Sequence, residues 1–410
     1  MELSWAILEK LSKENGDSYY LLDVERFSQN FDEFLMSFRK IYPKSYICYS
    51  YKTNYIPELC KIVNQKGGYA EVVSEMEYEL ALKIGVLPEK IIVNSPFKNF
   101  DFLEKALLNE SIVNFDSYYE IEYLKEIVKK HKNKVFSIGI RCNFAKPYKE
   151  KFSRFGFDVN NEEFVYAFKE LIDVYGVRIK GIHCHYPYRD LESFIYRIEN
   201  LLNVANNLFN EPPEYIDIGG GFFGKMPQSL KEQFNCYIPT YEDYAKLIAT
   251  KMKENYNYLK ESLKPKLFLE PGTAIVADTM KYVCKVIDIK KINNKFIAIT
   301  SGSVINMGHS NKVKRPFKIY SNETATNYYY NIDITGYTCM EDDYLITNYN
   351  GPLTKGDYIV IDNLGSYSFN FKPPFILPNV PILKYEPSNK TFVVVKRKEN
   401  FEHIFDTFVF

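Results

Sequence analysis

Lys52 is the residue of this sequence with the clearest potential for covalent chemistry. It lies at the end of an aromatic and apolar run, in YSYKTNY. Burial there lowers the pKa of a lysine ammonium and favours the neutral amine, which can form an imine with an aldehyde. The alternative is an ordinary lysine paired with a carboxylate, since ion pairs also perturb pKa values. The surroundings of Lys52 must decide between the two.

A glycine run offers a place for a phosphate. Gly219, Gly220 and Gly221 follow an apolar stretch in DIGGGFFG. Residues without side chains let backbone N–H groups approach a phosphate closely. A tight glycine turn is the alternative, because three glycines carry little information without their structural context.

Glu270 and two histidines complete the set of chemically capable residues. Glu270, in LFLEPG, can hold a pyridinium nitrogen protonated so that the ring draws off carbanion density, or it can simply cap the turn that follows. His185 can stack on such a ring, although a single histidine on a strand is more often structural. His183 and His185 share one strand face in HCH, which raises a metal site. The other three histidines lie elsewhere, so we expect no metal.

The elements that would position these residues alternate between strand and helix. Over about two-thirds of the chain, short β-rich runs are separated by amphipathic stretches such as EMEYELALKIG. The expected strands begin at Ser45, Tyr69, Ile91, Ser111, Phe136, Ile179, Tyr215 and Lys266. This pattern predicts an α/β fold, a closed (β/α)8 TIM-like barrel.

Polar residues gather at the same end of the expected strands. In (β/α)8 enzymes the active site lies at the C-terminal ends of the strands, where the βα loops converge. The residues at or near those ends are Lys52, Ser74, Arg141, His185, Gly219 to Gly221 and Glu270. We therefore expect a single site at the mouth of the barrel.

A second domain follows the barrel. After Gly272 the sequence changes to Val-, Ile- and Tyr-rich runs separated by turn residues, which predicts a C-terminal, mainly antiparallel β domain. We expect the barrel to span residues 24–270 and the β domain to span residues 271–410, joined by residues 1–23.

Composition excludes several classes of protein. The 410 residues hold 52 Lys plus Arg and 52 Asp plus Glu, so the basic surplus of a nucleic-acid-binding protein is missing. Neither a secretory signal nor an apolar run long enough to span a bilayer is expected. Seven cysteines without CxxC spacing imply no disulfide framework or zinc knuckle. We expect a reduced, cytoplasmic enzyme that acts on a small molecule.

The motifs resemble, in consistent order, the fold-type III pyridoxal-phosphate decarboxylases, the group of ornithine, arginine and diaminopimelate decarboxylases. YSYKTNY is similar to the family's YAVKAN segment, GIHCHY to its GLHFH segment and DIGGGF to its phosphate loop. The blocks VNFDSYYEIEYL, IGIRCN, SRFGF, GYTCMEDDYL and NLGSYSF also have counterparts. The resemblance covers nearly the whole chain and implies an alanine racemase-like barrel.

The resemblance assigns roles to individual residues. It implies that Lys52 holds pyridoxal 5'-phosphate as a Schiff base, that His185 stacks on the ring and that Glu270 pairs with the ring nitrogen. Further cofactor contacts are expected at Glu71, Arg141, Gly219, Gly220, Gly221, Gly272, Thr273 and Tyr367, and substrate contacts at Met340, Asp343 and Tyr320. Cys339 would enter the neighbouring subunit's site as a proton donor, so a homodimer with shared active sites is expected.

Three departures from the family pattern bear on cofactor and substrate. Thr273 stands where the family's EPGR has arginine, and Pro187 and Tyr188 replace the glycine and phosphate-binding serine of HxGS. Relatives that act on free diamines have Asp or Glu after the cysteine, whereas this chain has Met340, which offers only soft apolar contact. The preferred substrate should therefore lack a free distal amine.

The departures resemble the siderophore branch of the family, whose members decarboxylate citrate-acylated amino acids. Our first hypothesis is decarboxylation of a citrate-acylated diamino acid, such as N-citrylornithine in rhizoferrin biosynthesis. Lys146, Lys149, Lys151 and Arg189 lie in loops that could receive citryl carboxylates, although solvated surface charge is the ordinary explanation for any one of them.

Three other hypotheses stay open at this point. The chain could decarboxylate a free diamino acid (diaminopimelate, ornithine or lysine), or it could be a pyridoxal-phosphate-dependent amino-acid racemase. It could also be a non-catalytic, decarboxylase-like regulator, with Thr273 and Pro187 as signs of decay. Retention of Lys52, His185, Glu270 and Cys339 argues against the regulator.

Overall fold

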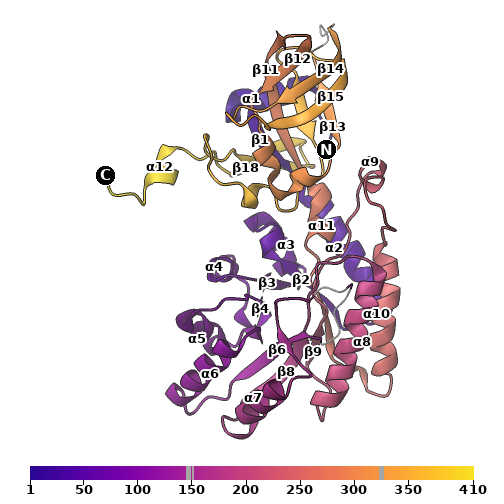
Figure 1. The fold of residues 1–410 in the computed structure, drawn as a ribbon, viewed down its shortest axis with the longest axis vertical. Coiled ribbons are helices and arrows are strands. Elements are labelled where there is room, and N and C mark those ends of the chain that lie inside the picture. The colour runs from indigo at the N-terminus through magenta and orange to yellow at the C-terminus, as the bar shows by residue number, and fades with distance from the viewer. Residues whose placement is uncertain (145–148, 150–151, 323–326) are drawn as a thin grey trace. The chain divides into compact units, whose positions relative to one another are not determined.

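The computed structural model describes residues 1–144, 149, 152–322 and 327–410, which form two compact units (Figure 1). One unit combines Met1–Phe27, Gly224–Cys236 and Ile275–Phe410, and the other combines Ser28–Phe223 and Tyr237–Ala274. The second unit alternates strands with helices, whereas the first consists mainly of strands.

Eight parallel strands form a closed barrel in the second unit, which confirms the predicted (β/α)8 architecture. In chain order they are β2 (Ser45–Ser50), β3 (Tyr69–Val72), β4 (Ile91–Val93), β5 (Ile112–Phe115), β6 (Ser137–Asn143), β8 (Arg178–His183), β9 (Tyr215–Asp217) and β10 (Lys266–Leu269). Pairing of β10 with β2 and of β5 with β6 closes the ring. A short additional strand, β7 (Phe157–Asp158), pairs with β6.

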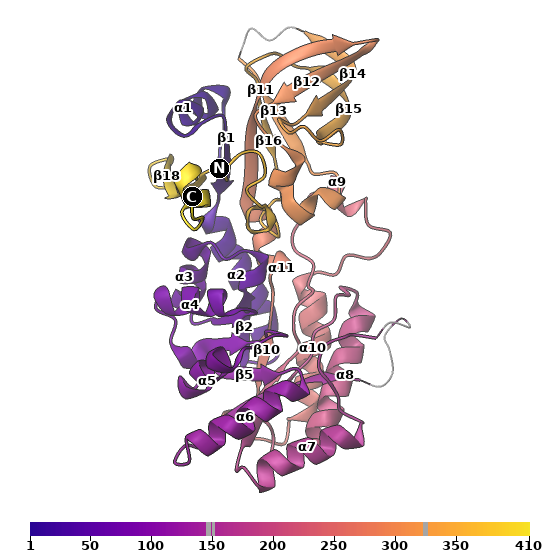
Figure 2. The same cartoon turned by 60° about the vertical axis from the view of Figure 1, so that its left-hand side comes forward.

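Amphipathic helices surround these strands (Figure 1). They are α2 (Val24–Arg39), which begins in the first unit, α3 (Pro57–Gln65), α4 (Glu75–Lys83), α5 (Phe100–Leu108), α6 (Tyr118–Lys130), α7 (Glu162–Asp173), α8 (Leu191–Leu208) and α10 (Tyr241–Asn255). Figures 1 and 2 both show α8 and α10 side by side. Ser74, which the sequence placed at the barrel mouth, is the N-cap of α4 and accepts a hydrogen bond from Glu77 N.

The first unit contains a mainly antiparallel sheet, as predicted. Its central strand β11 (Met280–Ile292) pairs antiparallel with β1 (Ser18–Leu22), which itself pairs in parallel with β17 (Ile382–Glu386). The other strands are β12 (Lys295–Thr300), β13 (Phe317–Tyr320), β14 (Tyr328–Thr335), β15 (Tyr344–Pro352), β16 (Tyr358–Ile361) and β18 (Thr391–Lys396). The N-terminal strand therefore completes a sheet built from the C-terminal third of the chain.

Short helices complete the secondary structure. The first unit also contains α1 (Trp5–Asn15), α9 (Gln228–Lys231) and α12 (Phe401–Phe405), and α11 (Thr273–Val276) follows the last barrel strand. Leu8 and Leu11 of α1 pack with Tyr19 of β1 and Tyr358 of β16 in the core of the sheet unit. Among the described residues, none of the helices has the length and apolar character needed to cross a lipid bilayer.

Candidate active site

Lys52 lies beside a buried carboxylate at the mouth of the barrel. It belongs to a short 3-10 turn, Tyr51–Thr53, directly after β2. Its Nζ is 2.5 Å from Oε2 of Glu71 on the neighbouring strand β3. Glu71 is 1% exposed, and burial raises the pKa of its carboxyl while the charge of Lys52 acts in the opposite direction. The ion pair considered as the alternative explanation for Lys52 is therefore present.

Glu270 is a buried carboxylate held by several polar contacts. It follows β10 and is 2% exposed. Its Oε1 accepts a hydrogen bond from Asn94 Nδ2 at 2.5 Å and lies 3.3 Å from Nε2 of His183. Burial alone would raise the pKa of Glu270, but the contact with His183 and the charge of Lys52 hold it well below its usual value. Glu270 is thus ionised at neutral pH.

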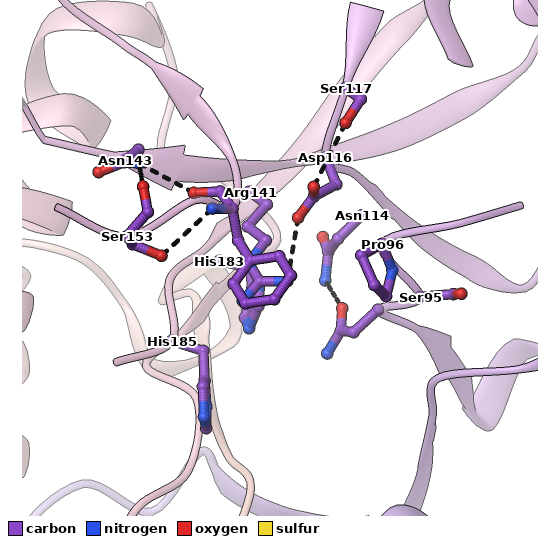
Figure 3. Close-up of polar contacts among 12 residues, drawn as sticks. Ser95, Pro96, Asn114, Asp116, Ser117, Arg141, Asn143, Ser153, His183 and His185 are labelled. Carbon is purple, nitrogen blue, oxygen red and sulfur yellow. Dashed lines mark hydrogen bonds and ion pairs between the residues drawn. The ribbon is translucent and has the colours of Figure 1, made fainter. Parts of the chain in front are cut away.

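A chain of buried side chains leads from β9 to Glu270. Tyr215 OH donates to Asn114 Oδ1 at 2.6 Å, and Asn114 Nδ2 donates to Asn94 Oδ1 at 2.7 Å. Figure 3 shows the hydrogen bond of the Asn114 side chain as a dashed line. Because an amide nitrogen can only donate, these contacts fix Asn94 with its Nδ2 toward Glu270.

Two glycines make room for the first member of this chain. A Cβ on Gly139 of β6 would lie 1.9 Å from Tyr215 OH and 2.0 Å from Asn114 Oδ1. A Cβ on Gly181 of β8 would lie 2.4 Å from the Tyr215 ring. The two glycines therefore leave space for the Tyr215 ring, and the ring brings its hydroxyl to Asn114.

The glycine loop after β9 leaves no space for side chains. Gly219 and Gly221 have φ values of 71° and 98°, a region that favours glycine. A Cβ on Gly219 would lie 2.4 Å from Cys184 O, and a Cβ on Gly220 would lie 2.4 Å from Glu270 O. The loop backbone consequently packs directly against the ends of two neighbouring strands.

His185 lies next to the glycine loop and is neutral. Its Nδ1 accepts a hydrogen bond from Gly220 N at 3.0 Å, so Nδ1 carries no proton. The same atom lies 3.6 Å from Oε2 of Glu270. Burial lowers the pKa of His185 to about 4, although 29% of its side chain is accessible. A neutral, partly accessible imidazole is suited to stacking on a planar ring.

Arg141 of β6 has a carboxylate partner within the protein. Its Nη1 lies 2.9 Å from Oδ1 of Asp116, and both side chains are buried (Figure 3). The ring of Phe155 covers the guanidinium, with 4.5 Å between its centroid and Cζ. The pair joins the IGIRCN block to the VNFDS block, and a contact between Arg141 and a cofactor stays a prediction.

The turn after Glu270 packs against the turn that carries Lys52. A Cβ on Gly272 would lie 2.1 Å from Thr53 Oγ1, so this position accepts only glycine. Thr273, the next residue, begins α11 and is half-buried. The close approach at Gly272 brings the end of β10 next to the end of β2.

The expected proton donor and two expected substrate contacts lie in the other unit, between β14 and β15. Cys339 is exposed and unpaired, and Met340 is half-buried. Asp343 is buried, and it accepts hydrogen bonds from Ser303 Oγ at 2.9 Å and from Thr338 Oγ1 at 2.6 Å. Asp343 therefore stabilises the loop that presents Cys339.

Tyr320 and Tyr367 also belong to the sheet unit. Tyr320 ends β13 and is half-buried. Tyr367 has a φ of 51°, a conformation that costs energy for a bulky residue and often marks a functional position. Its carbonyl oxygen accepts a hydrogen bond from His309 N at 2.9 Å. The backbone at Tyr367 is thus held in an unusual conformation by a defined contact.

Comparison with known families decides the class of this site. A family model described as "Pyridoxal-dependent decarboxylase, pyridoxal binding domain" matches residues 28–277, more than half of the chain. The chain belongs to the pyridoxal-dependent decarboxylases. It is therefore an enzyme that uses pyridoxal phosphate and releases carbon dioxide from an amino acid.

Similar sequences include several diaminopimelate decarboxylases, and similar solved structures also include a lysine/ornithine decarboxylase and a lysine decarboxylase. The diaminopimelate decarboxylase of Aquifex aeolicus is 27% identical over 413 residues, which cover 97% of this chain and 93% of the relative. The structure of the Helicobacter pylori diaminopimelate decarboxylase in complex with L-lysine matches with a TM-score of 0.81 and 22% identity, covering 97% of this chain and 98% of that one. The Methanocaldococcus jannaschii enzyme gives a TM-score of 0.83 at 20% identity, with 98% and 94% covered. These structures share the fold.

The decarboxylase site fits its cofactor. Oε1 of Glu71 is buried and has no hydrogen-bond partner among the described residues. A group bound beside Lys52 can therefore supply a partner for this oxygen. The glycine loop offers bare backbone, and Glu270 offers an ionised carboxylate. An amine, a glycine backbone that a phosphate can approach and an acceptor for a ring nitrogen are the features that pyridoxal phosphate requires.

Several polar residues of the site were not anticipated. Asn94 follows β4, at the same strand end that marked the other residues, and Asp217 opens the DIGGG run, so both had a signal. Asp217 Oδ1 accepts a hydrogen bond from Gly219 N at 2.9 Å. Burial and the nearby charge of Glu270 raise the pKa of Asp217 well above its usual value. Arg197 of α8 had no sequence signal at all.

The metal alternative has a structural counterpart. His183, Asp217 and Glu270 each place one ligand atom within 4.8 Å of the others, and all three are buried. His183 thus belongs to a group that could hold a cation, but His185, the other histidine of the HCH pattern, is not part of this group. The expectation that the enzyme needs no metal stays a prediction.

Of the four loop cations that could receive citryl carboxylates, the structure describes two. Lys146 and Lys151 lie outside the described residues. Lys149 forms an ion pair of 2.8 Å with Asp190, and the guanidinium of Arg189 lies 5.3 Å from the centroid of the Phe223 ring. Lys149 therefore already has a carboxylate partner in the protein.

Proposed function

We propose that this decarboxylase removes the α-carboxyl group of a free diamino acid, with diaminopimelate, ornithine and lysine as candidates. The loop between β14 and β15 carries the proposal. Next to Cys339 it exposes two carboxylates, Glu341 and Asp342, which can receive a distal ammonium group. The name shared by relatives that cover almost the whole chain also supports a diamino acid.

The barrel residues have complementary roles in this proposal. Lys52 would hold the cofactor through its amine, and Glu71, 2.5 Å from Nζ, would keep that amine in place. Glu270 would accept a hydrogen bond from the ring nitrogen, and His185 would stack on the ring. When bound, the cofactor takes up the electron pair released as the bond between Cα and the carboxyl group breaks. The residues of the protein would orient that bond for cleavage.

Cys339 supplies the proton that replaces carbon dioxide. Its exposed thiol donates that proton to Cα, and the thiolate is reprotonated from solvent. We further propose that the enzyme is a homodimer, as the family resemblance implies, in which Cys339 of each subunit serves the partner's site. Such sharing requires an exposed donor, which the structure provides, and a two-fold interface.

Subunit complementation tests this sharing. Lys52→Ala and Cys339→Ala homodimers should each be inactive. Unfolded together and refolded, they should regain about a quarter of wild-type activity, because half of the dimers are mixed and each mixed dimer has one intact site. No recovery would place Cys339 and Lys52 of one site on the same chain.

A citrate-acylated diamino acid is the second candidate. Met340 lies next to Cys339 and carries no charge, and Thr273 stands where relatives have a cation. Both departures favour a substrate whose distal amine is blocked, such as N-citrylornithine in siderophore assembly. The exposed carboxylates of Glu341 and Asp342 favour the free diamino acid instead, because they can receive its distal ammonium group.

A substrate panel separates the two candidates. Purified enzyme with pyridoxal phosphate is incubated with diaminopimelate, ornithine, lysine and their citryl amides, and mass spectrometry detects products that have lost carbon dioxide. We expect the highest kcat/KM for a free diamino acid. A higher kcat/KM for a citryl amide than for its parent amino acid would favour the second candidate.

A further inference from the structure

Arg197 is a fully buried cation directly behind the glycine loop. Its Nη1 donates to Gly220 O at 2.6 Å, and its Nη2 donates to Tyr186 O at 2.8 Å and to Tyr188 O at 2.5 Å. These acceptors are neutral, as is Ser193 Oγ, which accepts from Nε at 3.2 Å, and Arg197 forms no ion pair with a carboxylate in the described part of the chain. Burial lowers the pKa of Arg197 only to about 10, so the guanidinium is charged at neutral pH.

The contact with Gly220 sets the direction of the next amide. In a trans peptide the C=O and N–H groups point to opposite sides, so Gly221 N–H points away from the guanidinium. Gly219 N donates to Asp217 and Gly220 N to His185. Gly221 N has no acceptor among the described residues, and a Cβ on Gly221 would lie 3.5 Å from Arg197 Nη2. An unpaired amide with a cation behind it favours an anion.

The same guanidinium holds the segment in which the family pattern is broken. Pro187 and Tyr188 replace a glycine and a phosphate-binding serine, and Tyr188 O is one of the three carbonyls that Arg197 binds. Thr273 removes a further cation. We propose that Arg197 is a positioning residue for the cofactor phosphate, which supplies the charge and loop geometry lost at Pro187, Tyr188 and Thr273. The inference rests on the cofactor of this family and is independent of the proposed substrate.

Two forms of the cofactor isolate the effect on the phosphate. Binding of pyridoxal 5'-phosphate and of phosphate-free pyridoxal to the cofactor-free protein is measured by isothermal titration calorimetry, without substrate. We expect Arg197→Gln, which removes the charge and keeps hydrogen-bond donors, to weaken pyridoxal phosphate binding at least ~10-fold. Binding of pyridoxal should change less than ~3-fold, because pyridoxal has no group at the loop. Equal weakening of both ligands, or of neither, would overturn the proposal.

Matched variants separate charge from folding. Arg39→Gln removes a guanidinium that also donates to a backbone carbonyl, Ser45 O at 3.0 Å, but at the start of β2, and should leave the ratio of the two affinities unchanged. Arg197→Lys restores the charge and should return the ratio toward the wild-type value; a ratio as low as that of Arg197→Gln would contradict a role for the charge. If the variants fail to fold, the titrations of wild-type protein still test the proposal. Equal affinity of wild-type protein for pyridoxal 5'-phosphate and pyridoxal would overturn it.

Discussion

Asn94 donates a hydrogen bond of 2.5 Å to Glu270, and both side chains are buried in the barrel. An N–H donor stabilises a carboxylate more than a carboxylic acid, so this contact favours the charged form of Glu270. Asn114 Nδ2 donates to Asn94 Oδ1, and this second hydrogen bond prevents rotation of the Asn94 amide. Asn94 therefore fixes both the orientation and the ionisation of the carboxylate that faces the cofactor site.

Removal of this donor should slow catalysis. We expect Asn94→Ala to lower kcat about 10- to 100-fold, the effect of one lost hydrogen bond to a charged group, with a smaller change in KM. Steady-state assays of carbon dioxide release provide the measurement. Asn64→Ala, which removes a surface amide bound to Gly85 O, is the control and should be neutral. An unchanged kcat in Asn94→Ala would remove its role in orienting Glu270.

Gly181 and Tyr215 should be energetically coupled. Gly181→Ala places a Cβ 2.4 Å from the Tyr215 ring, and overpacking of this kind costs about 1–3 kcal/mol. Tyr215→Leu removes the obstructing ring, so the double variant should lose less free energy of unfolding than the two single variants together. Urea unfolding of all four proteins measures the coupling. Additive losses would show that the ring does not limit residue 181.

Lys52 should be required both for the visible absorbance of the bound cofactor and for turnover. We expect Lys52→Ala to lose the visible absorbance of bound pyridoxal phosphate and all detectable carbon dioxide release, because no amine remains to hold the aldehyde. Lys66→Ala, which breaks a partly exposed 2.7 Å ion pair with Asp32, should keep both properties. A wild-type spectrum in Lys52→Ala would mean that the cofactor is held elsewhere.

Residue 340 should control the preference for the distal end of the substrate. Met340→Asp adds a carboxylate next to Cys339, and we expect kcat/KM to rise for free diamino acids relative to their citryl amides, by about 10-fold or more. Met76→Asp, at an exposed position of the barrel unit, should leave the ratio of the two kcat/KM values unchanged. A ratio that did not respond to Met340→Asp would separate this residue from substrate selection.

His185 should make the cofactor-free protein sensitive to acid. Its pKa is lowered to about 4 in the folded chain, against about 6.5 when unfolded. Between these values the unfolded chain binds more protons, so the contribution of His185 to stability is complete above about pH 6.5 and is lost as pH falls toward 4. Urea unfolding at pH 5 and pH 7 should show a smaller loss in His185→Gln than in wild type. His403→Gln is the control, and equal losses in His185→Gln and wild type would contradict the shift.

The sequence predicted the barrel because each strand is a short apolar run that ends in a polar residue. This rule located Lys52, Glu270 and the glycines correctly at strand ends. It placed Ser74 in the same group, yet Ser74 caps α4, a role that its spacing to Glu77 also encodes. A polar residue at a strand end can serve the next helix as well as the site.

Contacts made through the fold could not be predicted from the sequence. Arg197 lies on a helix 23 positions before Gly220, and only the path of the chain brings its guanidinium to that carbonyl. The acidic run after Met340 gave no indication that Asp343 points inward while Glu341 and Asp342 are exposed. Side-chain direction in a loop depends on which backbone donors the surrounding elements leave open.

The site of cofactor attachment tests the account most directly. Sodium borohydride reduces the imine between pyridoxal phosphate and a lysine to a stable secondary amine, which survives proteolysis and peptide mapping by mass spectrometry. We expect the added mass on the peptide that contains Lys52, and on no other peptide. Attachment to a different lysine, or no attachment in protein that decarboxylates its substrate, would contradict the account.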